Sequence, residues 1–477
     1  MIFDAATIAR ATRGTLVSAG RGVAGPVMTD TRRLQRDGWF IALSGDKFDG
    51  HDFLTHAQVA GAAGAVVSDA SRVPAGWKEG LVVVSDTLIA LQDLGRAARH
   101  AFTGPVIGVT GSVGKTTTRV MIADVLRGEG PEFRRVHCTQ GNLNNHIGVP
   151  LTLCATPPDA EFMVVELGMN HPGEIALLQE IALPDVRVIT NVGAAHVEGC
   201  GSIAGVAAAK QELFDGARPG DVCIVNDGDE WIVNMPVPPG VRVVRFGRGD
   251  DCDIRLTDVG VDAERLQTRM RVETPEGAVR AVLDVPGLHL AECALAAISV
   301  GFVLRMPRNS IGPSLGRYAP EGMRNRIERV HDVVVINDAY NANPISMRAA
   351  LQTLAALAGG TAGAGTRVAA LGDMLELGST EAESHREVLR TGRALGITLY
   401  VTGERMAAAA AALGETVGTG TVTTFADVEA LAGALAHVLS PGSALLIKGS
   451  RGSKMERVLE CWRRDGRGIT INEEKGG

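Results

Sequence analysis

The sequence predicts an α/β protein of three domains. At 477 residues the chain is too long for one domain of roughly 100–200 residues. Strand-like apolar runs alternate with helical stretches, which is typical of parallel sheets, and one such run ends in a glycine-rich turn. We predict a small α/β domain over residues 1–103, a central P-loop ATPase-like domain with a parallel or mixed sheet over 104–315, and a C-terminal Rossmann-like domain over 316–477.

The boundaries follow from composition between these runs. Phe102–Pro105 is predicted to be one linker, and the glycine- and proline-rich piece Pro307–Pro320 a second. The strands are expected at Trp39–Leu43 and Leu81–Val84 in the first domain, at Val106–Thr110, Phe162–Glu166, Val186–Thr190 and Val222–Asn226 in the second, and at Val333–Asn337, Val368–Gly372, Leu399–Gly403, Val422–Phe425 and Ala444–Lys448 in the third.

Composition excludes several classes of protein. A formal charge of −7 argues against a nucleic-acid or anionic-membrane partner. The seven cysteines are odd in number and form no C-x-x-C pair, which argues against a disulfide framework or a zinc site. Asp4 interrupts any signal peptide, and no segment approaches the roughly 20 apolar residues needed to span a bilayer. We expect a cytoplasmic protein, acting as a monomer on small molecules.

The glycine-rich turn is predicted to bind phosphate. It contains Thr110, Gly111, Ser112, Val113, Gly114, Lys115, Thr116 and Thr117. Consecutive backbone amides at a strand-to-helix turn bind anions. Lys115 can reach the β- and γ-phosphates, and the hydroxyl of Thr116 can bind Mg²⁺. The strict Walker pattern would require glycine at Val109, so the alternative is an ordinary turn with a surface lysine.

Three further side chains follow strands or helices nearby. Glu166 ends an apolar strand and His196 lies just past another, so both are candidate Mg²⁺ ligands, although histidine is unusual for so hard an ion. Lys210 follows an alanine-rich helical run. The simpler alternatives are a solvated strand end, a hydrogen-bonded loop histidine and a surface lysine. Only seven residues of the chain are lysine, which favours a specific purpose for each lysine in a motif.

Taken in order, the motifs resemble those of the Mur ligases of peptidoglycan synthesis. They are T-G-S-V-G-K-T-T, G-N-L-N-N-H-I-G-V-P (Gly141–Pro150), V-V-E-L-G, N-V-G-A-A-H-V-E-G, A-A-A-K-Q-E-L-F, N-D-A-Y-N-A-N-P (Asn337–Pro344), L-G-D-M-L-E-L-G (Leu371–Gly378) and I-K-G-S-R-G-S-K-M-E (Ile447–Glu456), with T-D-T-R (Thr29–Arg32) and G-D-K-F-D-G-H (Gly45–His51) in the first domain. The chain lacks the D-N-P-R box of the ligase that adds diaminopimelate or lysine.

The resemblance implies an ATP-dependent ligase that joins D-alanyl-D-alanine to UDP-muramoyl-tripeptide through an acyl phosphate. ATP and two Mg²⁺ ions are the implied cofactors, with Thr116 and Glu166 holding one ion and His196 the second. Lys210 resembles the family's carbamylated lysine, whose two carbamate oxygens suit Mg²⁺. Lys115, Lys210, His196 and Glu166 are the implied catalytic residues.

It also implies three sets of binding residues. The nucleotide would be bound by the phosphate loop with Asn142, His289, Arg324 and Asp338, with Arg326 as the alternative to Arg324 at the terminal phosphate. The dipeptide side would be contacted by Tyr340, Asn341, Asn343, Lys448 and Arg451. The uridine diphosphate would be bound by Thr31, Arg32, Asp49, Gly50 and His51. Asn343 and Pro344 are also expected to start a helix.

The chain departs from the family near the adenine. The usual pattern is H-N-x-x-N-A-L-A-A, whereas His289–Ala297 has Leu290 and Cys293 in place of both asparagines. A hydrogen-bonding amide toward the adenine is therefore lost at this position. Three alternatives remain: another ligase of the superfamily such as a folylpolyglutamate synthase, a P-loop kinase or GTPase that uses Asp338 as its Walker-B residue, and an inactive nucleotide-binding scaffold.

Overall fold

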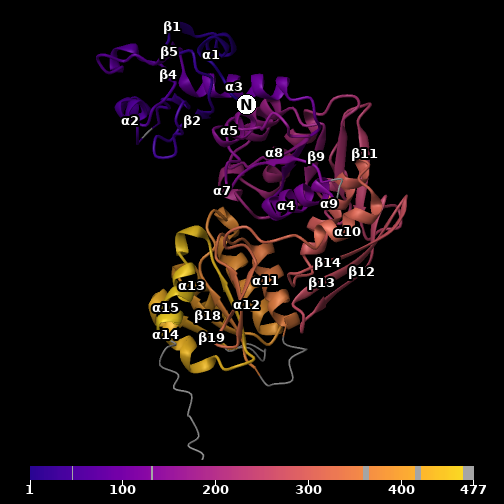
Figure 1. Cartoon of the computed structure of the whole chain (residues 1–477). Helices are drawn as coiled ribbons and strands as arrows, with labels where there is room; N and C mark the ends of the chain where they lie inside the picture. Colours follow the sequence, from indigo (N-terminus) through magenta and orange to yellow (C-terminus); the bar gives the residue numbers. More distant parts are fainter. Residues whose placement is uncertain (46, 130–132, 358–364, 414–420, 466–477) are drawn as a thin grey trace, which may run out of the picture.

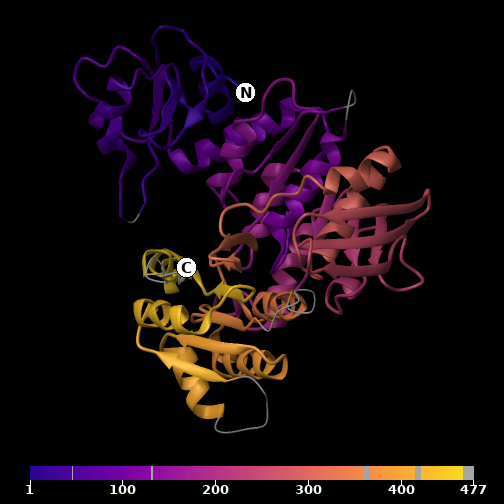
Figure 2. The same ribbon diagram turned by 60° about the horizontal axis from the view of Figure 1, so that its bottom comes forward.

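A computed structural model describes residues 1–45, 47–129, 133–357, 365–413 and 421–465. Their strands form three sheets, one in each predicted domain. Figures 1 and 2 show the N-terminal domain in indigo at one end, the central domain in magenta, and the C-terminal domain in orange and yellow at the other end. The α/β prediction is confirmed. No helix of the described residues has the length and apolar character needed to cross a membrane.

The N-terminal domain has a five-stranded sheet in the order β1-β5-β4-β3-β2, in which only β1 is antiparallel to its neighbour. Gly64 and Gly80 lie against the ring of buried Trp39, because a Cβ at either position would come within 2.5 Å of the ring. The strands are β1 (Thr15–Ala19), β2 (Val27–Met28), β3 (Trp39–Ile41), β4 (Gly64–Val67) and β5 (Gly80–Val83), and the helices are α1 (Ala5–Thr12), α2 (Leu54–Val59) and α3 (Thr87–Ala101).

The central domain contains a nine-stranded sheet in the order β14-β13-β12-β11-β10-β9-β6-β8-β7. Every residue of β6, β8 and β10 is buried, as expected for parallel strands covered on both faces. The strands are β6 (Val106–Thr110), β7 (Val136–Cys138), β8 (Phe162–Glu166), β9 (Val186–Ile189), β10 (Val222–Asn226), β11 (Arg242–Gly247), β12 (Ile254–Asp262), β13 (Gln267–Thr274) and β14 (Gly277–Leu283).

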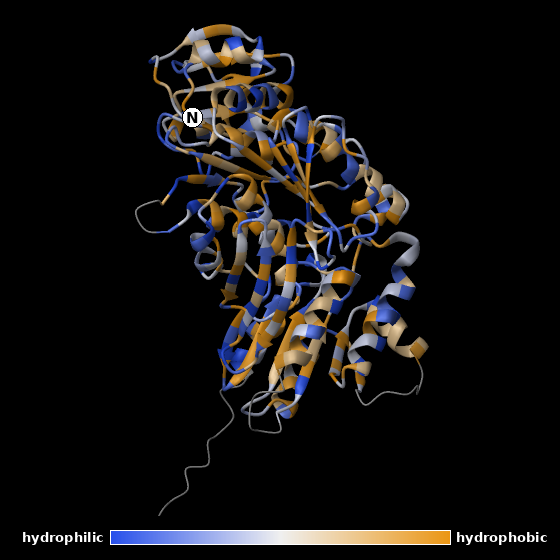
Figure 3. Ribbon diagram, turned by 90° about the vertical axis from the view of Figure 1, so that its right-hand side faces the viewer, coloured by the Kyte–Doolittle hydropathy of each residue, from blue (hydrophilic) through white to orange (hydrophobic). Residues whose placement is uncertain are grey.

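The helices of the central domain pack against this sheet through buried apolar residues, and Figure 3 shows apolar residues along many strands of the molecule. They are α4 (Lys115–Arg127), α5 (Gly148–Cys154), α6 (Glu174–Ala182), α7 (Val197–Cys200), α8 (Ile203–Asp215), α9 (Leu290–Val303) and α10 (Arg308–Leu315). The last helix corrects the second predicted linker: most of Pro307–Pro320 is helical, with Ile311 and Leu315 buried.

The C-terminal sheet has the order β15-β16-β20-β17-β18-β19 and is parallel except for the β15–β16 pair. The strands are β15 (Arg326–Val330), β16 (Val333–Asp338), β17 (Arg367–Leu371), β18 (Thr398–Thr402), β19 (Val422–Phe425) and β20 (Ala444–Lys448), and the helices are α11 (Pro344–Leu357), α12 (Glu381–Ala394), α13 (Glu404–Leu413), α14 (Val428–Val438) and α15 (Glu456–Asp465). The expected strands of this domain are all present, with ends shifted by at most one residue.

Candidate active site

The phosphate loop lies between β6 and α4 and is shaped by the neighbouring strand end. Gly111 has a φ of 149°, and a Cβ there would lie 1.9 Å from Oγ1 of Thr190. The amide of Val113 donates to Oδ1 of Asn191 at 2.9 Å. The first amides of α4 have no acceptor within the helix, so they form the positive end that can receive an anion.

Lys115 curls back over this loop. Its Nζ donates to the carbonyl of Gly111 at 2.6 Å. Burial lowers the pKa of Lys115, and the negative charge of Glu166 opposes that shift. The lysine is therefore close enough to feel the carboxylate at the end of β8, and its contact with the loop carbonyl is one that a phosphate could replace.

Glu166 is buried at the carboxyl end of β8, with 2% of its surface exposed. Nδ2 of Asn144 donates to its Oε1 at 2.9 Å, and Nε of Arg119 lies 3.3 Å from its Oε2. Arg119 is fully buried and also pairs with Glu321. Arg119 and Asn144 were missed in the sequence. The signal for Arg119 was a charge on α4 four residues after Lys115, on a helix face that the core must cover.

His196 and Lys210 lie beside the loop. His196 has a φ of 59°, and its Nδ1 is 2.9 Å from Oε2 of Glu376 in the C-terminal domain. Burial and then Lys115 lower the pKa of His196, while Glu376 opposes this. Lys210 is 1% exposed, and its Nζ has no hydrogen-bond partner among the described residues. Burial, reinforced by Lys115, lowers the pKa of Lys210 well below its usual range.

A cleft of about 550 Å³ between the central and C-terminal domains collects most of the predicted residues. Buried Lys210 does not line the cleft. Thr110, Gly111 and the five predicted residues of the first domain do not line it either. The predicted residues that line the cleft are Ser112, Val113, Gly114, Lys115, Thr116, Thr117, Asn142, Glu166, His196, His289, Arg324, Asp338, Tyr340, Asn341, Asn343, Lys448 and Arg451.

The C-terminal wall is built on two adjacent strand ends. Asp338 ends β16 and Lys448 ends β20, in register with each other. Nζ of Lys448 donates to Asp338 and, at 3.0 Å, to the carbonyl of Asn341. This ion pair fixes the turn that carries Tyr340 and Asn341. Because Asp338 belongs to this sheet and not to that of the phosphate loop, it is not a Walker-B residue.

Two arginines were candidates for the terminal phosphate. The guanidinium carbon of Arg324 lies 3.8 Å from the centre of the Tyr340 ring, and Arg324 lines the cleft. Arg326 lies on β15, has 61% of its side chain exposed and pairs with Glu328; it does not line the cleft. The arrangement therefore favours Arg324. Arg451, at the cleft rim, is 61% exposed and pairs with Glu456 at 3.0 Å.

The turn before α11 behaves as expected. The helix begins at Pro344, and Oδ1 of Asn343 accepts the amide of Ser346 at 2.9 Å.

Near the expected adenine position, Leu290 is buried and Cys293 packs against the phosphate loop, with its Sγ 3.0 Å from where a Cβ on Gly114 would be. Burial raises the pKa of Cys293 to about 12. Neither residue offers the amide hydrogen bonds that asparagine would.

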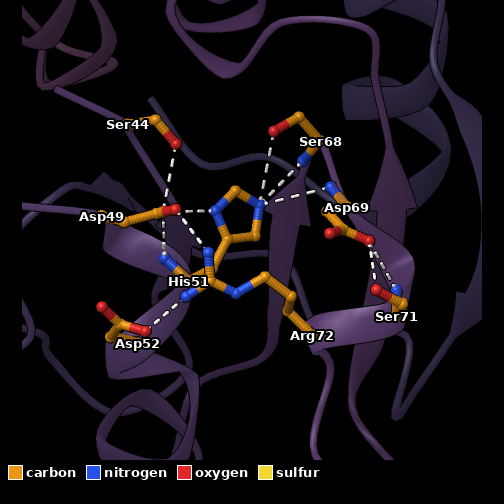
Figure 4. Close-up of polar contacts among 8 residues, drawn as sticks. All are labelled: Ser44, Asp49, His51, Asp52, Ser68, Asp69, Ser71 and Arg72. Carbon is orange, nitrogen blue, oxygen red and sulfur yellow. Dashed lines mark hydrogen bonds and ion pairs between the residues drawn. The ribbon is translucent and has the colours of Figure 1, made fainter.

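In the first domain, the side chains of the predicted residues Asp49 and His51 form a hydrogen bond with each other (Figure 4). Nδ1 of His51 lies 2.6 Å from Oδ1 of Asp49. Nε2 accepts the amide of Ser68 at 3.0 Å, so the ring is neutral with its proton on Nδ1. The hydrogen bonds from His51 lower the pKa of Asp49. Arg72 pairs with Asp49 as well; it was missed in the sequence.

This network leaves other groups of the first domain open to a ligand. Arg32 has 87% of its side chain exposed beside Asp30, and Thr31 and Gly50 are partly exposed. Asp49 and His51 therefore shape the loop, whereas Arg32 is the predicted residue with a reachable cation. Phe48, beside the loop, is 74% exposed.

The family is established by comparison with known proteins. Residues 109–301 match the Mur ligase middle domain, and residues 325–451 match the Mur ligase, glutamate ligase domain. The chain belongs to the Mur ligase family.

Two relatives and two solved structures are similar to this chain over nearly its whole length. The UDP-N-acetylmuramoyl-tripeptide–D-alanyl-D-alanine ligase of Bacillus subtilis is 36% identical over 95% of this chain and 96% of its own. The ligase of the same name from Escherichia coli is 35% identical over 92% of this chain and 94% of its own. The crystal structure of MurF from Acinetobacter baumannii has a TM-score of 0.86 at 28% identity, covering 97% and 99% of the two chains. MurF from Thermotoga maritima in complex with ADP has a TM-score of 0.79 at 25% identity, covering 93% and 98%.

Proposed function

We propose that this protein is an ATP-dependent ligase that joins D-alanyl-D-alanine to UDP-N-acetylmuramoyl-tripeptide, forming the pentapeptide precursor of peptidoglycan. The observation that carries the proposal is the cleft, in which the phosphate loop faces the C-terminal turn across one cavity. Relatives named for this reaction are more than 30% identical over nearly the whole chain. A single cleft suits a reaction in which two substrates and a nucleotide must meet.

The first step needs positive charge. The terminal carboxylate of the tripeptide attacks the γ-phosphorus of ATP, ADP leaves, and an acyl phosphate forms. Two anions approach each other in this step, so stabilisation by positioned cations is the main contribution expected from the protein. The amides at the start of α4 and Nζ of Lys115 would bind the phosphates. Arg324, which is stacked on Tyr340 and lines the same cleft, would add a second cation.

The donor set fits Mg²⁺ bound together with a nucleotide. Glu166 presents Oε2, whose only close partner among the described residues is the ion pair with Arg119. No three His, Cys, Asp or Glu side chains of the described residues converge as a metal cage, which agrees with the habit of Mg²⁺ to use few carboxylates plus phosphate oxygens. Thr116, Glu166 and His196 would hold the ions, and Mg²⁺ would neutralise charge developing on the phosphates.

We propose that Lys210 is carbamylated. Its amine is buried without a hydrogen-bond partner among the described residues, and its lowered pKa favours the neutral form that adds CO₂. The carbamate would carry a negative charge toward Lys115, which lies close enough to affect the pKa of Lys210. It would also give two oxygens to a metal ion. Arginine could not serve here, because its guanidinium does not deprotonate.

The second step takes place at the C-terminal wall. The neutral amine of D-alanyl-D-alanine attacks the acyl carbon, and phosphate leaves from the tetrahedral intermediate. Asn341 and Asn343 offer amide groups in a turn fixed by Lys448, and Arg451 offers an exposed cation to the dipeptide carboxylate. Thr31, Arg32, Asp49, Gly50 and His51 would bind the uridine diphosphate, with Arg32 closest to the role of a phosphate contact.

Phosphate release on mixing the protein with ATP, Mg²⁺ and UDP-muramoyl-tripeptide tests the proposal. Release is expected to depend on D-alanyl-D-alanine, and mass spectrometry should show the pentapeptide. Lys115→Met should lose this activity, whereas Lys78→Met, an exposed lysine in the first domain, is the matched control. Release without the dipeptide would indicate a kinase or ATPase, activity only with a folate and glutamate would indicate the rival ligase, and no release would indicate a scaffold.

A further inference from the structure

A glutamate of the C-terminal domain contacts the histidine that we assign to Mg²⁺ in the central domain. Glu376 lies in the loop after β17, and its Oε2 is 2.9 Å from Nδ1 of His196. The backbones meet as well: the amide of Glu198 donates to the carbonyl of Glu376 at 3.4 Å. A Cβ on Gly378 would lie 3.6 Å from the Cα of Glu198. The two domains therefore meet at a built contact on the edge of the cleft.

Both partners have an unusual backbone. His196 has a φ of 59° and Glu376 a φ of 64°, which is the left-handed region that side chains other than glycine rarely adopt. Such conformations persist only where the surroundings over-determine them, and they cluster at functional sites. Here they occur in the two residues that touch across the domain boundary.

The loop that presents Glu376 is fixed by its own domain. The amide of Met374 donates to Nε2 of buried His385 at 3.0 Å, and the amide of Leu375 donates to Oγ of Ser450 at 2.9 Å. The carboxylate of Asp373, earlier in the loop, accepts backbone amides at the start of α13. Glu376 is thus carried on a rigid support and moves with the C-terminal domain.

The chemistry of the contact concerns the two nitrogens of one imidazole. A carboxylate beside Nδ1 favours the tautomer with the proton on Nδ1 and leaves the lone pair of Nε2 for a metal. Histidines that bind metals usually place the other nitrogen against such a partner. In the structure Nδ1 of His196 lies 2.9 Å from the Glu376 carboxylate and has no other hydrogen-bond partner among the described residues.

We propose that Glu376 is a positioning residue: when the C-terminal domain docks, its carboxylate fixes the orientation and tautomer of His196 in which Nε2 binds Mg²⁺. The metal site is then complete only when the domains are closed. This rests on the proposed function, because it takes His196 as a Mg²⁺ ligand. It makes domain closure and metal binding one coupled event.

The test compares Glu376→Gln with Glu198→Gln, which removes the same charge from an exposed neighbour in the same contact. Calorimetry measures the Mg²⁺ concentration that half-saturates binding of a non-hydrolysable ATP analogue in the presence of UDP-muramoyl-tripeptide. The half-saturating Mg²⁺ should rise roughly 10–100-fold in Glu376→Gln, the usual effect of removing such a partner, and stay within about twofold of wild type in Glu198→Gln. A merely structural role would lower the amount of folded protein without moving this value.

A second pair of variants asks whether Glu376 acts through His196. In a His196→Gln background, adding Glu376→Gln should produce little further change in half-saturating Mg²⁺. An unchanged value in the single variant, or an equal shift in both backgrounds, would overturn the proposal. Failure of the proposed function is a separate result: wild-type protein would then release no phosphate in response to D-alanyl-D-alanine, whereas the calorimetric comparison would still report on Glu376.

Discussion

Arg119 offers the most direct test of how the site is supported. It lies on α4 with none of its side chain exposed, and its guanidinium pairs with Glu166 and Glu321 and donates to the carbonyl of Thr139. Replacing Arg119 with methionine keeps most of the apolar volume and removes the charge. Glu166 would then be a buried carboxylate without its cation.

The expected cost follows from that orphaned charge. Breaking a buried ion pair by removing one partner costs about 3–5 kcal/mol. We expect the lower end, about 3 kcal/mol, because Glu321 is 40% exposed and can turn to water. For a domain of about 200 residues this corresponds to a melting temperature lower by roughly 6–12 °C. Differential scanning calorimetry measures it, with Arg96→Met as the control, since that arginine forms partly exposed pairs worth at most about 1 kcal/mol.

The double variant Arg119→Met/Glu166→Gln separates charge from packing. Removing both charges leaves no unpaired buried carboxylate at position 166, so the double variant should be more stable than Arg119→Met alone by about 1–2 kcal/mol. A loss below about 1 kcal/mol in Arg119→Met, or a double variant less stable than the single one, would refute the reasoning that Arg119 balances the buried carboxylate of Glu166.

Four further outcomes are expected. Lys210→Ala should lower kcat roughly 100-fold or more in the phosphate-release assay, and Lys210→Arg should do no better. Burial lowers the pKa of His289 to about 4, against about 6.5 in the unfolded chain. The unfolded state therefore binds a proton more readily than the folded state, and the free energy of unfolding should fall as pH drops from about 6.5 toward 4. In His289→Gln this fall in the free energy of unfolding should be smaller, as measured by urea titrations at several pH values. His51→Ala should raise KM for the UDP-substrate and change kcat little in steady-state kinetics, because it loosens only the first-domain loop. Small-angle scattering should show a smaller radius of gyration once an ATP analogue and UDP-muramoyl-tripeptide are added.

Local patterns explain what could be predicted from the sequence. The phosphate loop and the strands around it are encoded in contiguous residues, since five buried positions followed by Gly and Lys allow few other conformations. The same holds for the turn at Asn343, where a capping side chain precedes a proline. Glu166 and His196 follow strands in the sequence, and parallel strands bring their carboxyl ends to one edge.

Contacts between distant segments explain what was missed. Arg119 and Glu321 are 202 residues apart, and the local sequence around either residue does not predict the contact with the other. The prediction of a second linker is wrong because its glycine and proline residues lie within or beside the helix α10 (Arg308–Leu315). Gly312 instead lets α10 approach β14, since a Cβ there would lie 2.1 Å from the carbonyl oxygen of Arg280. The buried pair Ile311 and Leu315, four residues apart, was the helical signal.

The distribution of apolar contacts indicates which domain would move in the predicted closure of the cleft. Helix α3 of the N-terminal domain packs on α5 so tightly that a Cβ on Gly95 would lie 2.9 Å from the Cα of Pro150, and one continuous apolar cluster spans both domains. Separating them would expose that surface at about 25 cal/mol per Å². The buried residues of the main apolar clusters of the C-terminal domain all belong to that domain, and partly buried Ala194, Val261 and Leu266 of the central domain pack against one of them.

The segment that joins the central and C-terminal domains is held against the central domain as far as Glu321. Nη2 of Arg317 donates to the carbonyls of Asp124 and Gly128 at 2.9 and 2.7 Å, and Glu321 is tied to Arg119. The backbone then turns at Gly322 and Asn325, both with positive φ. A hinge at 322–325 would let the C-terminal domain swing while the rest of the protein stays together. Glu376 and His196 are 2.9 Å apart across the domain boundary, so a swing of the C-terminal domain would change this distance, and the proposed effect of Glu376 on Mg²⁺ binding would depend on closure.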